Sequence, residues 1–284
     1  MPTIESHDGT QLFYRDWGTG DPILFCSGWG LSSVQWQYQM TALSRAGMRT
    51  IAYDRRGHGR SDDPGRGYDY DTLARDLAAI IEQLDLADLT LVGHSMAGGE
   101  IVRYLTLEGS ERSSQVVVVG TSLPFSEQTD SNPRGIPSEM LEAVRTQWAE
   151  DFGRWIEQNE AAYFGDGLPG CDVGPVLREW TRADLLGCSL QALIEFNRLG
   201  AATDFRQELT DLQLPVLLVH GDHDASSPLE LSALQAASLL PNGTLATYRD
   251  APHGLYLTHR VQLNRDIAAF ASQPRRSIAG MRVA

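Results

Sequence analysis

Leu89-Thr-Leu-Val-Gly-His-Ser-Met-Ala-Gly-Gly-Glu100 is the stretch on which the interpretation of the whole chain depends. Its first part, Leu89 to Val92, is apolar and predicts a buried strand, whereas the residues from Glu100 to Leu107 follow a helical pattern. Small residues lie between these two segments, where a tight turn leaves no room for large side chains. A strand, a sharp turn and a helix in this order form a nucleophile elbow, which exposes Ser95 at the N-terminus of the helix. Because helix N-termini favour developing negative charge, Ser95 is predicted to be a catalytic nucleophile.

The pattern Gly-x-Ser-x-Gly is not complete here, because Ala97 stands where the last glycine is expected. One additional methyl group is small enough to fit where a helix and a strand pack closely. The alternative is an ordinary buried turn with an incidental serine. The flanking strand and helix favour the elbow over that alternative.

Composition and charge restrict the classes of protein that this chain can belong to. The 284 residues carry a formal net charge of −14, which argues against binding to nucleic-acid phosphates or to anionic membranes. No apolar stretch approaches the length of a transmembrane helix, and the first residues lack the apolar core of a signal peptide. The three cysteines have no paired spacing and are expected to be free thiols. We therefore expect a cytoplasmic protein, and the sequence leaves open whether it forms a homo-oligomer.

Apolar runs alternate with helical patterns along most of the chain. This alternation predicts an α/β fold in which parallel strands are joined by right-handed crossovers. The strands are expected at residues 3–6, 11–16, 22–26, 49–53, 89–92, 115–120, 214–220 and 244–249. The helices are expected at residues 34–46, 71–84, 100–107, 140–148, 152–157, 185–199, 228–240 and 258–270.

The alternation breaks between residues 121 and 199, where helical patches and aromatic residues gather. Because the strand pattern resumes afterwards, we expect an inserted helical cap at 121–199 rather than a second independent domain. The core would then consist of residues 1–120 and 200–271, and residues 272–284 would form a flexible C-terminal tail. Trp148 and Phe196 of the cap, together with Trp29, are predicted to line the substrate pocket.

Acidic residues and a histidine directly follow two later strands. Asp222 and Asp224 come after the strand at 214–220, and His253 comes after the strand at 244–249. The carboxyl ends of parallel strands share one edge of a sheet, so these side chains are expected near Ser95. A serine hydroxyl needs a neutral imidazole to take its proton, and a carboxylate must orient that imidazole.

Asp224 and His253 are the preferred acid and base. Asp222 directly follows a glycine and has a role of its own in starting the turn. His259 is the rival base, but it lies at the start of a helix beyond the loop, where a surface histidine is expected.

Two charged segments allow other interpretations. The segment from Asp54 to Asp62 contains several arginines, but acidic residues alternate with them, so a solvated, self-paired loop is expected rather than a nucleic-acid site. His220, Asp222, His223 and Asp224 resemble a metal cluster, but strand and turn geometry would point these side chains apart. We therefore predict no metal and no organic cofactor.

Taken together, the motifs resemble the cofactor-free haloperoxidase and perhydrolase branch of the α/β-hydrolases, which includes aryl esterases. The motifs that carry this resemblance are Ser27-Gly-Trp-Gly-Leu31, Tyr53-Asp-Arg-Arg-Gly-His-Gly-Arg-Ser61, Gly93-His-Ser-Met-Ala-Gly-Gly-Glu-Ile-Val-Arg-Tyr104, Val219-His-Gly-Asp-His-Asp224 and Ala251-Pro-His-Gly-Leu255. The resemblance covers about residues 3 to 271 and implies the α/β-hydrolase fold. It also implies that the backbone N–H groups of Trp29 and Met96 form the oxyanion hole, and that Asp224 is the acid. Ser27 and Ala97 depart from the family pattern, and both border this oxyanion hole.

We therefore expect a serine hydrolase that cleaves uncharged apolar or aromatic carboxylic esters through an acyl-enzyme. The resemblance also implies perhydrolase or haloperoxidase side activity. A lactonase, C–C hydrolase or acyltransferase acting on a specialised metabolite remains the alternative. A non-catalytic ligand-binding protein is disfavoured because a serine, an acid and a histidine are retained in the order of this family. The expected partner is a small-molecule ester or lactone.

Overall fold

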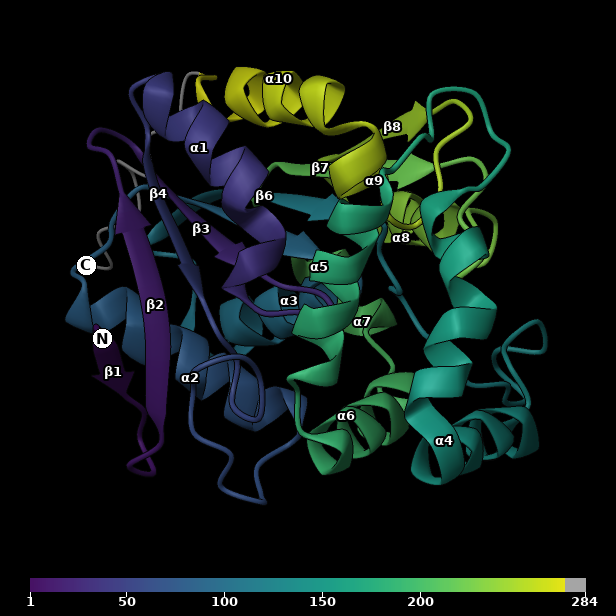
Figure 1. The fold of residues 1–284 in the computed structure, drawn as a ribbon. Coiled ribbons are helices and arrows are strands. Elements are labelled where there is room, and N and C mark those ends of the chain that lie inside the picture. Colours follow the sequence, from purple (N-terminus) through teal and green to yellow (C-terminus); the bar gives the residue numbers. More distant parts are fainter. Residues whose placement is uncertain (274–284) are drawn as a thin grey trace.

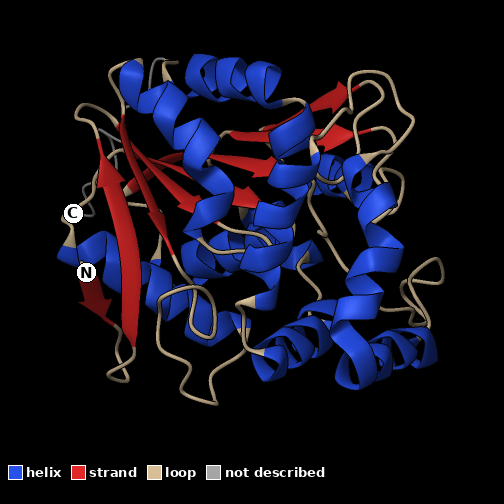
Figure 2. Cartoon of the chain, in the orientation of Figure 1, coloured by secondary structure: helices blue, strands red, loops and turns tan. Residues whose placement is uncertain are grey.

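A twisted sheet with helices on both faces forms the centre of the computed structural model, which describes residues 1–273 (Figures 1 and 2). The strand order is β1-β2-β4-β3-β5-β6-β7-β8. β2 pairs antiparallel with both β1 and β4, and all other neighbouring strands are parallel. The strands are β1 (Thr3–Glu5), β2 (Gln11–Trp17), β3 (Pro22–Cys26), β4 (Arg49–Tyr53), β5 (Leu89–His94), β6 (Ser113–Val119), β7 (Val216–Gly221) and β8 (Gly243–Tyr248). The predicted eight-stranded, mostly parallel sheet is thus confirmed.

Helices flank the sheet and also extend beyond its edge. They are η1 (Ser33–Trp36), α1 (Gln37–Arg45), α2 (Tyr70–Gln83), α3 (Ala97–Glu108), α4 (Ser138–Phe164), α5 (Pro175–Leu186), α6 (Leu190–Ala202), α7 (Arg206–Asp211), α8 (Ala233–Leu239), α9 (Leu255–Thr258) and α10 (Arg260–Ala271). None of the helices within residues 1–273 combines the length and the apolar character that crossing a membrane requires.

The strand β6 illustrates why the central strands are apolar on both faces. Val116 and Val118 pack into the core cluster that contains residues of α2 and α3. Val117 and Val119 pack into the second cluster, which contains residues of α1 and α10. Because successive side chains of a strand point to opposite faces, a strand between two helix layers needs apolar residues at every position.

The prediction of one continuous helix at residues 185–199 is wrong. The structure divides this segment between α5, which ends at Leu186, and α6, which begins at Leu190. The side chain of Ser189 accepts a hydrogen bond from the backbone N–H of Ala192, so it caps a new helix instead of continuing the old one.

Two further helix boundaries differ from those expected. The helix expected at 228–240 is reduced to α8, since the chain from 222 to 232 is taken up by turns. The two patches expected at 140–148 and 152–157 join in α4, which is interrupted by the non-helical backbone of Asp151 (φ −158°).

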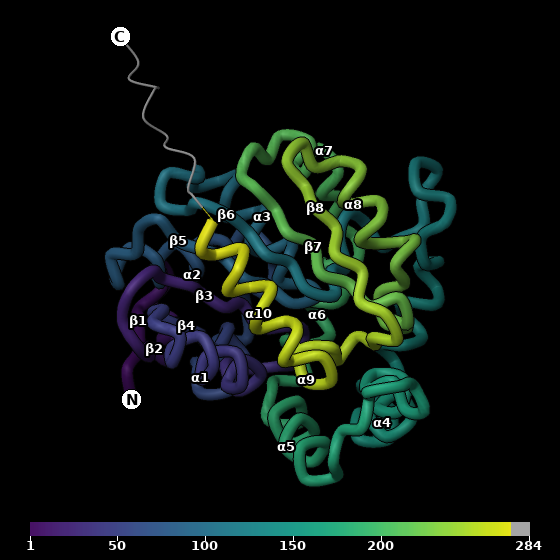
Figure 3. Tube along the Cα trace, turned by 90° about the horizontal axis from the view of Figure 1, so that it is seen from above, coloured from purple at the N-terminus to yellow at the C-terminus, as the bar shows by residue number. Residues whose placement is uncertain are grey.

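The helices α4, α5 and α6, followed by the short helix α7, lie between the end of β6 and the start of β7. Figure 3 shows that α4 and α5 lie apart from the sheet and from the helices that flank it. The helix α6 continues to Ala202, three residues beyond the end expected for the cap. Of the expected flexible tail, residues 274–284 lie outside the described part of the chain.

Candidate active site

Ser95 occupies a sharp turn between β5 and α3. β5 ends at His94 and α3 begins at Ala97, so two residues reverse the chain. Ser95 has a φ of +56°, a left-handed conformation that costs a non-glycine residue about 1–3 kcal/mol. A hydrogen bond of 2.9 Å from its backbone N–H to the carbonyl of Val119 holds the turn against the neighbouring strand. The hydroxyl of Ser95 is thereby held at the positive end of a helix of 12 residues.

Gly93 makes this turn possible because strand and helix approach closely there. A Cβ atom at position 93 would lie 2.8 Å from the side chain of Ile101 and 3.1 Å from the backbone of Ala97. Ala97 itself is fully buried. The close contact therefore falls on Gly93, and the methyl group of Ala97 is accommodated where the family pattern has a glycine.

His253 and Asp224 follow the last two strands and meet above the sheet edge. Nδ1 of His253 lies 2.7 Å from Oδ2 of Asp224. Oδ1 of Asp224 accepts hydrogen bonds from the backbone N–H groups of Ser226 (2.9 Å) and Ser227 (2.8 Å). A carboxylate at Nδ1 places the proton on that nitrogen and leaves Nε2 of the imidazole free to act as a base.

Asp224 is suited to remain a carboxylate. Burial raises the pKa of its carboxyl group, but the adjacent imidazoles of His253 and His220 and the hydrogen bond from the backbone of Ser227 lower it more. The pKa of Asp224 therefore lies below its ordinary value of 3.8. Nε2 of His220 lies 3.4 Å from Oδ2 of the same carboxylate and 2.8 Å from the carbonyl of Ser227. This histidine therefore contacts both ends of the turn from Asp224 to Ser227.

The alternative acid and base lie elsewhere. Asp222 is exposed, and its Oδ1 lies 2.8 Å from Nδ1 of His223, which is also exposed. His259 contacts the hydroxyl of the preceding Thr258 at 2.9 Å. The structure therefore places Asp224 against His253, and it places neither Asp222 nor His259 there.

The four residues that resemble a metal cluster in the sequence are not brought together. His220 and Asp224 are buried, whereas Asp222 and His223 point to the surface. Within residues 1–273, the structure gathers no group of three or more histidine, cysteine, aspartate or glutamate side chains that could hold a metal ion.

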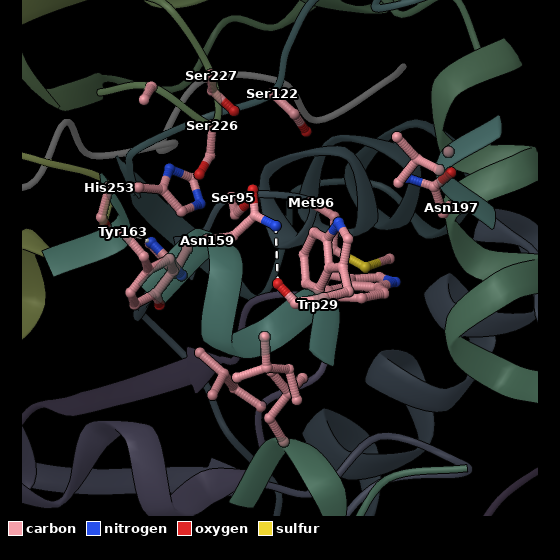
Figure 4. A pocket seen from close by; sticks show the side chains of 18 of the residues that line it. Trp29, Ser95, Met96, Ser122, Asn159, Tyr163, Asn197, Ser226, Ser227 and His253 are labelled. Atoms are coloured by element: carbon pink, nitrogen blue, oxygen red, sulfur yellow. Dashed lines mark hydrogen bonds between the residues drawn. The ribbon is translucent and has the colours of Figure 1, made fainter. Parts of the chain in front are cut away.

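Trp29 and Met96, whose backbone N–H groups were predicted to form the oxyanion hole, both lie at the cavity that contains Ser95. Both residues line this cavity together with Ser95 and His253 (Figure 4). Within residues 1–273, neither N–H group donates a hydrogen bond to a protein acceptor. Two unused donors beside a serine hydroxyl are the arrangement that an oxyanion requires.

The cavity has a volume of about 500 Å³ and is covered by α4, α5 and α6. Trp29, Trp148 and Phe196, which were expected at the pocket, all line it. The rings of Trp29 and Trp148 lie 4.5 Å apart.

The lining also contains polar side chains that were not predicted from the sequence: Ser122, Asn159, Glu160, Arg178, Arg182, Asn197, Ser226 and Ser227. Glu160 and Arg182 form an ion pair of 2.7 Å, so these two opposite charges are paired within the wall of the cavity.

The loop from Asp54 to Asp62 was expected to be solvated, and this expectation is wrong for its first half. Asp54, Arg55, Arg56 and His58 are all at most 2% exposed. The arginines are paired with acids from distant elements, such as Glu100 of α3 and Asp76 of α2. Sequence reasoning missed these pairs because it looked for partners within the loop itself.

A second residue that sequence reasoning missed is His94, which precedes Ser95. It is buried, and its ring centroid lies 4.7 Å from that of His253. Its Nε2 lies 3.2 Å from the backbone carbonyl of His253, to which it donates. Burial, together with the nearby His253, lowers the pKa of His94 to about 3, so this imidazole is neutral at pH 7. The signal in the sequence that could have identified it is a polar side chain directly before the predicted nucleophile.

Comparisons with known proteins agree with this geometry. The model of the α/β hydrolase fold family matches residues 21–260. A non-heme haloperoxidase of Rhodococcus erythropolis is 38% identical over 95% of this chain and 99% of its own length. A bifunctional esterase/perhydrolase of Acinetobacter calcoaceticus is 34% identical over 95% of this chain and 99% of its own length. The crystal structure of a bromoperoxidase from Bacillus anthracis is similar with a TM-score of 0.89 and 34% identity, over 95% of this chain and 98% of that one. The resemblance inferred from the motifs is thus confirmed.

Proposed function

Because this chain belongs to the α/β-hydrolase fold family, we propose that it is a serine hydrolase that cleaves uncharged apolar or aromatic carboxylic esters through an acyl-enzyme. The observation that carries the proposal is the position of Ser95 on a strained turn, in one cavity with a histidine that Asp224 orients. In the proposed roles Ser95 is the nucleophile, His253 the base, and Asp224 the residue that orients His253.

In the first half of the reaction, Oγ of Ser95 attacks the carbonyl carbon of the ester, and Nε2 of His253 takes the hydroxyl proton. The carbonyl oxygen becomes an oxyanion and accepts hydrogen bonds from the N–H groups of Trp29 and Met96. When the tetrahedral intermediate collapses, the bond to the alcohol oxygen breaks, and His253 returns the proton to that oxygen. The alcohol leaves, and the acyl group remains on Ser95.

In the second half, a water molecule attacks the acyl carbon while His253 takes one of its protons. The bond between the acyl carbon and Oγ of Ser95 breaks, and the proton passes to Oγ. The products are the carboxylic acid and the free enzyme. The paired carboxylate of Asp224 stabilises the imidazolium in both halves.

The lining of the cavity supports esters with an apolar or aromatic group. Aromatic side chains of the loop at Trp29 and of α4 and α6 form much of the wall. The charged residues of the wall include opposite charges that pair with one another, as in Glu160 and Arg182. A charged substrate would have to compete with these pairs, and the net charge of −14 disfavours anions further.

We propose hydrogen peroxide as a second acyl acceptor in place of water. The name of the relative from Acinetobacter calcoaceticus, an esterase/perhydrolase, supports this proposal. A peroxide oxygen would attack the acyl carbon while His253 takes its proton. The bond to Ser95 would break, a peracid would leave, and Ser95 would recover the proton. The reaction uses the same residues as hydrolysis and differs in the nucleophile of the second half.

A panel of chromogenic esters with graded acyl length tests the proposal. Turnover of short to medium uncharged esters is expected, together with labelling of Ser95 by a serine-directed phosphonate and full activity after dialysis against a chelator. The same panel with hydrogen peroxide and bromide measures peracid formation. A protein that neither turns over any ester nor reacts with the phosphonate is not a serine hydrolase.

We also propose that the protein acts in the cytoplasm. Cys26, Cys171 and Cys188 are free thiols, which supports a reducing compartment such as the cytoplasm. The partner that we propose is a small-molecule ester or lactone.

A further inference from the structure

A buried arginine lies beneath the loop that carries one of the two oxyanion donors. Arg55 follows β4, and its side chain is 2% exposed. Glu100 in the first turn of α3 is fully buried and lies 2.6 Å from it. α3 is also the helix that begins next to Met96, so the ion pair joins the two structural halves of the candidate oxyanion hole.

The guanidinium of Arg55 makes four hydrogen bonds, and two of them go to the loop. Nη2 donates to the backbone carbonyl of Ser27 (2.7 Å), and Nη1 donates to the carbonyl of Gly28 (3.4 Å). Nε (3.0 Å) and Nη2 (2.6 Å) both donate to Oε2 of Glu100. One planar cation therefore contacts two successive peptide groups of the loop and a carboxylate of α3, and the carbonyl of Gly28 also accepts from the backbone N–H of Leu31 (3.3 Å).

The peptide group between Gly28 and Trp29 is the relevant one. It contains the carbonyl that Arg55 holds and the N–H that is proposed to bind the oxyanion. In a trans peptide these two groups lie in one plane and point in opposite directions. A carbonyl turned towards Arg55 therefore turns the N–H of Trp29 away from Arg55, and Trp29, unlike Arg55, lines the cavity.

The second donor lies at the start of the helix that carries Glu100. The backbone N–H of Glu100 bonds to the carbonyl of Met96 at 3.4 Å, so Glu100 belongs to the helical turn that Met96 begins. Through Glu100, the loop at Ser27 and Gly28 is tied to this turn.

The buried ion pair of Arg55 and Glu100 is not expected to add much to the free energy of unfolding. Replacing a buried ion pair by apolar residues is often neutral or stabilising, because both charges lose their hydration. Oε1 of Glu100 is buried and has no hydrogen-bond partner within residues 1–273, which adds to this cost. Stability alone therefore does not account for a buried ion pair that contacts the loop at Ser27 and Gly28.

We propose that Arg55 is a positioning residue that, paired with Glu100, orients the two backbone N–H groups of the oxyanion hole. This inference rests on the serine-hydrolase function proposed above. It predicts a loss in the stabilisation of the transition state and not in the binding of the substrate.

The test is Arg55→Lys, because lysine keeps the charge but cannot hold two carbonyls and a carboxylate with one planar group. Loss of one oxyanion donor costs about 10²–10³ in kcat, so misorientation is expected to lower kcat by about 10- to 100-fold. KM should stay within about threefold of the wild-type value, since uniform binding is unchanged. The affinity for a trifluoromethyl ketone, which forms a tetrahedral adduct on Ser95, should fall by the same factor as kcat.

Arg56→Lys is the matched control. Arg56 is also fully buried and is paired with Asp76 (2.7 Å) and Asp8 (3.0 Å), but its hydrogen bonds go to neither Ser27 nor Gly28. This variant is expected to lose stability while kcat remains close to that of the wild type. Equal kcat in Arg55→Lys and in the wild type would overturn the proposal, as would a loss confined to KM.

A double variant keeps the test decisive if Arg55→Lys does not fold. Arg55→Met combined with Glu100→Leu removes both charges and leaves no unpaired ion. It is expected to fold and to show the same loss in kcat and in ketone affinity, and wild-type values in the folded double variant would also overturn the proposal. A wild-type protein that turns over no ester would instead overturn the function on which the proposal rests.

Discussion

Nδ1 of His253 lies 2.7 Å from Oδ2 of Asp224, although 29 residues separate them in the chain. The other oxygen of this carboxylate is held by the backbone N–H groups of Ser226 and Ser227. The orientation of the imidazole therefore depends on one carboxylate that is itself fixed by a turn. This relationship leads to the first prediction.

Asp224→Asn is expected to lower kcat by about 10³- to 10⁴-fold. The asparagine side chain can still accept the backbone N–H groups of the turn, so the fold should be retained. Its NH₂ group, however, faces Nδ1 of His253 and favours the tautomer with the proton on Nε2. That tautomer cannot take the proton of Ser95, and steady-state kinetics on a chromogenic ester measure the loss.

Asp222→Asn is the matched control for this prediction. Asp222 is two residues away, faces His223 and points to the surface. Its replacement should change kcat by no more than about threefold. If Asp222→Asn is the more damaged of the two variants, the assignment of the acid is wrong.

Ser95→Ala is expected to remove nearly all ester turnover, by about 10⁴- to 10⁶-fold in kcat. The variant should also fail to react with a serine-directed phosphonate, which can be followed by mass spectrometry of the intact protein. Unchanged circular dichroism would show that the loss is chemical. Turnover in the variant that is comparable to that of the wild type would exclude Ser95 as the nucleophile.

The sequence was sufficient to predict the sheet because its signals are local. The strand at Pro22 to Cys26 and the second half of the strand at Ser113 to Val119 are continuous apolar runs, as expected for strands that are covered on both faces. The elbow at Ser95 is likewise encoded in a few adjacent residues. The proximity of the serine, the acid and the histidine then followed from the rule that the carboxyl ends of parallel strands share one edge of the sheet.

Features that depend on distant pairing could not be predicted in this way. Arg55 was interpreted as part of a solvated loop because Glu100, its partner, lies 45 residues further along the chain. The break between α5 and α6 depends on the cap at Ser189, which is a weak signal within a helical pattern. The polar residues of the cavity come from α4, α5 and α6 and from two loops, and their convergence is a property of the tertiary fold.

His58 is expected to make the protein less stable in mild acid. Burial and the nearby charge of Arg55 lower the pKa of His58 from 6.5 to about 3 in the folded state. The unfolded chain therefore binds a proton below pH 6.5 that the folded protein does not bind until about pH 3. Stability is complete above pH 6.5 and falls as the pH falls towards 3, by about 2 kcal/mol at pH 5 for this one histidine.

His58→Phe tests this prediction, because it removes the titrating group and keeps a ring beside Phe196, whose centroid lies 5.8 Å away. Urea unfolding at pH 8 and pH 5 should show a smaller loss of unfolding free energy in the variant than in the wild type, by about 2 kcal/mol. Replacement of the exposed His7 by glutamine serves as the control. An identical dependence on pH in wild type and His58→Phe would contradict the prediction.

Trp148 is expected to limit the length of the acyl group that the cavity accepts. Trp148 is 3% exposed and lines the cavity, and its ring centroid lies 4.5 Å from that of Trp29. Trp148→Ala removes this wall, so a long acyl ester should gain relative to a short one, by about tenfold in the ratio of their kcat/KM values, since apolar pockets discriminate by roughly 1–3 kcal/mol. Trp180→Ala is the control, because Trp180 lies on α5, is 40% exposed and does not belong to the lining of the cavity. If both variants keep the wild-type ratio, Trp148 packs the cap and does not select the substrate.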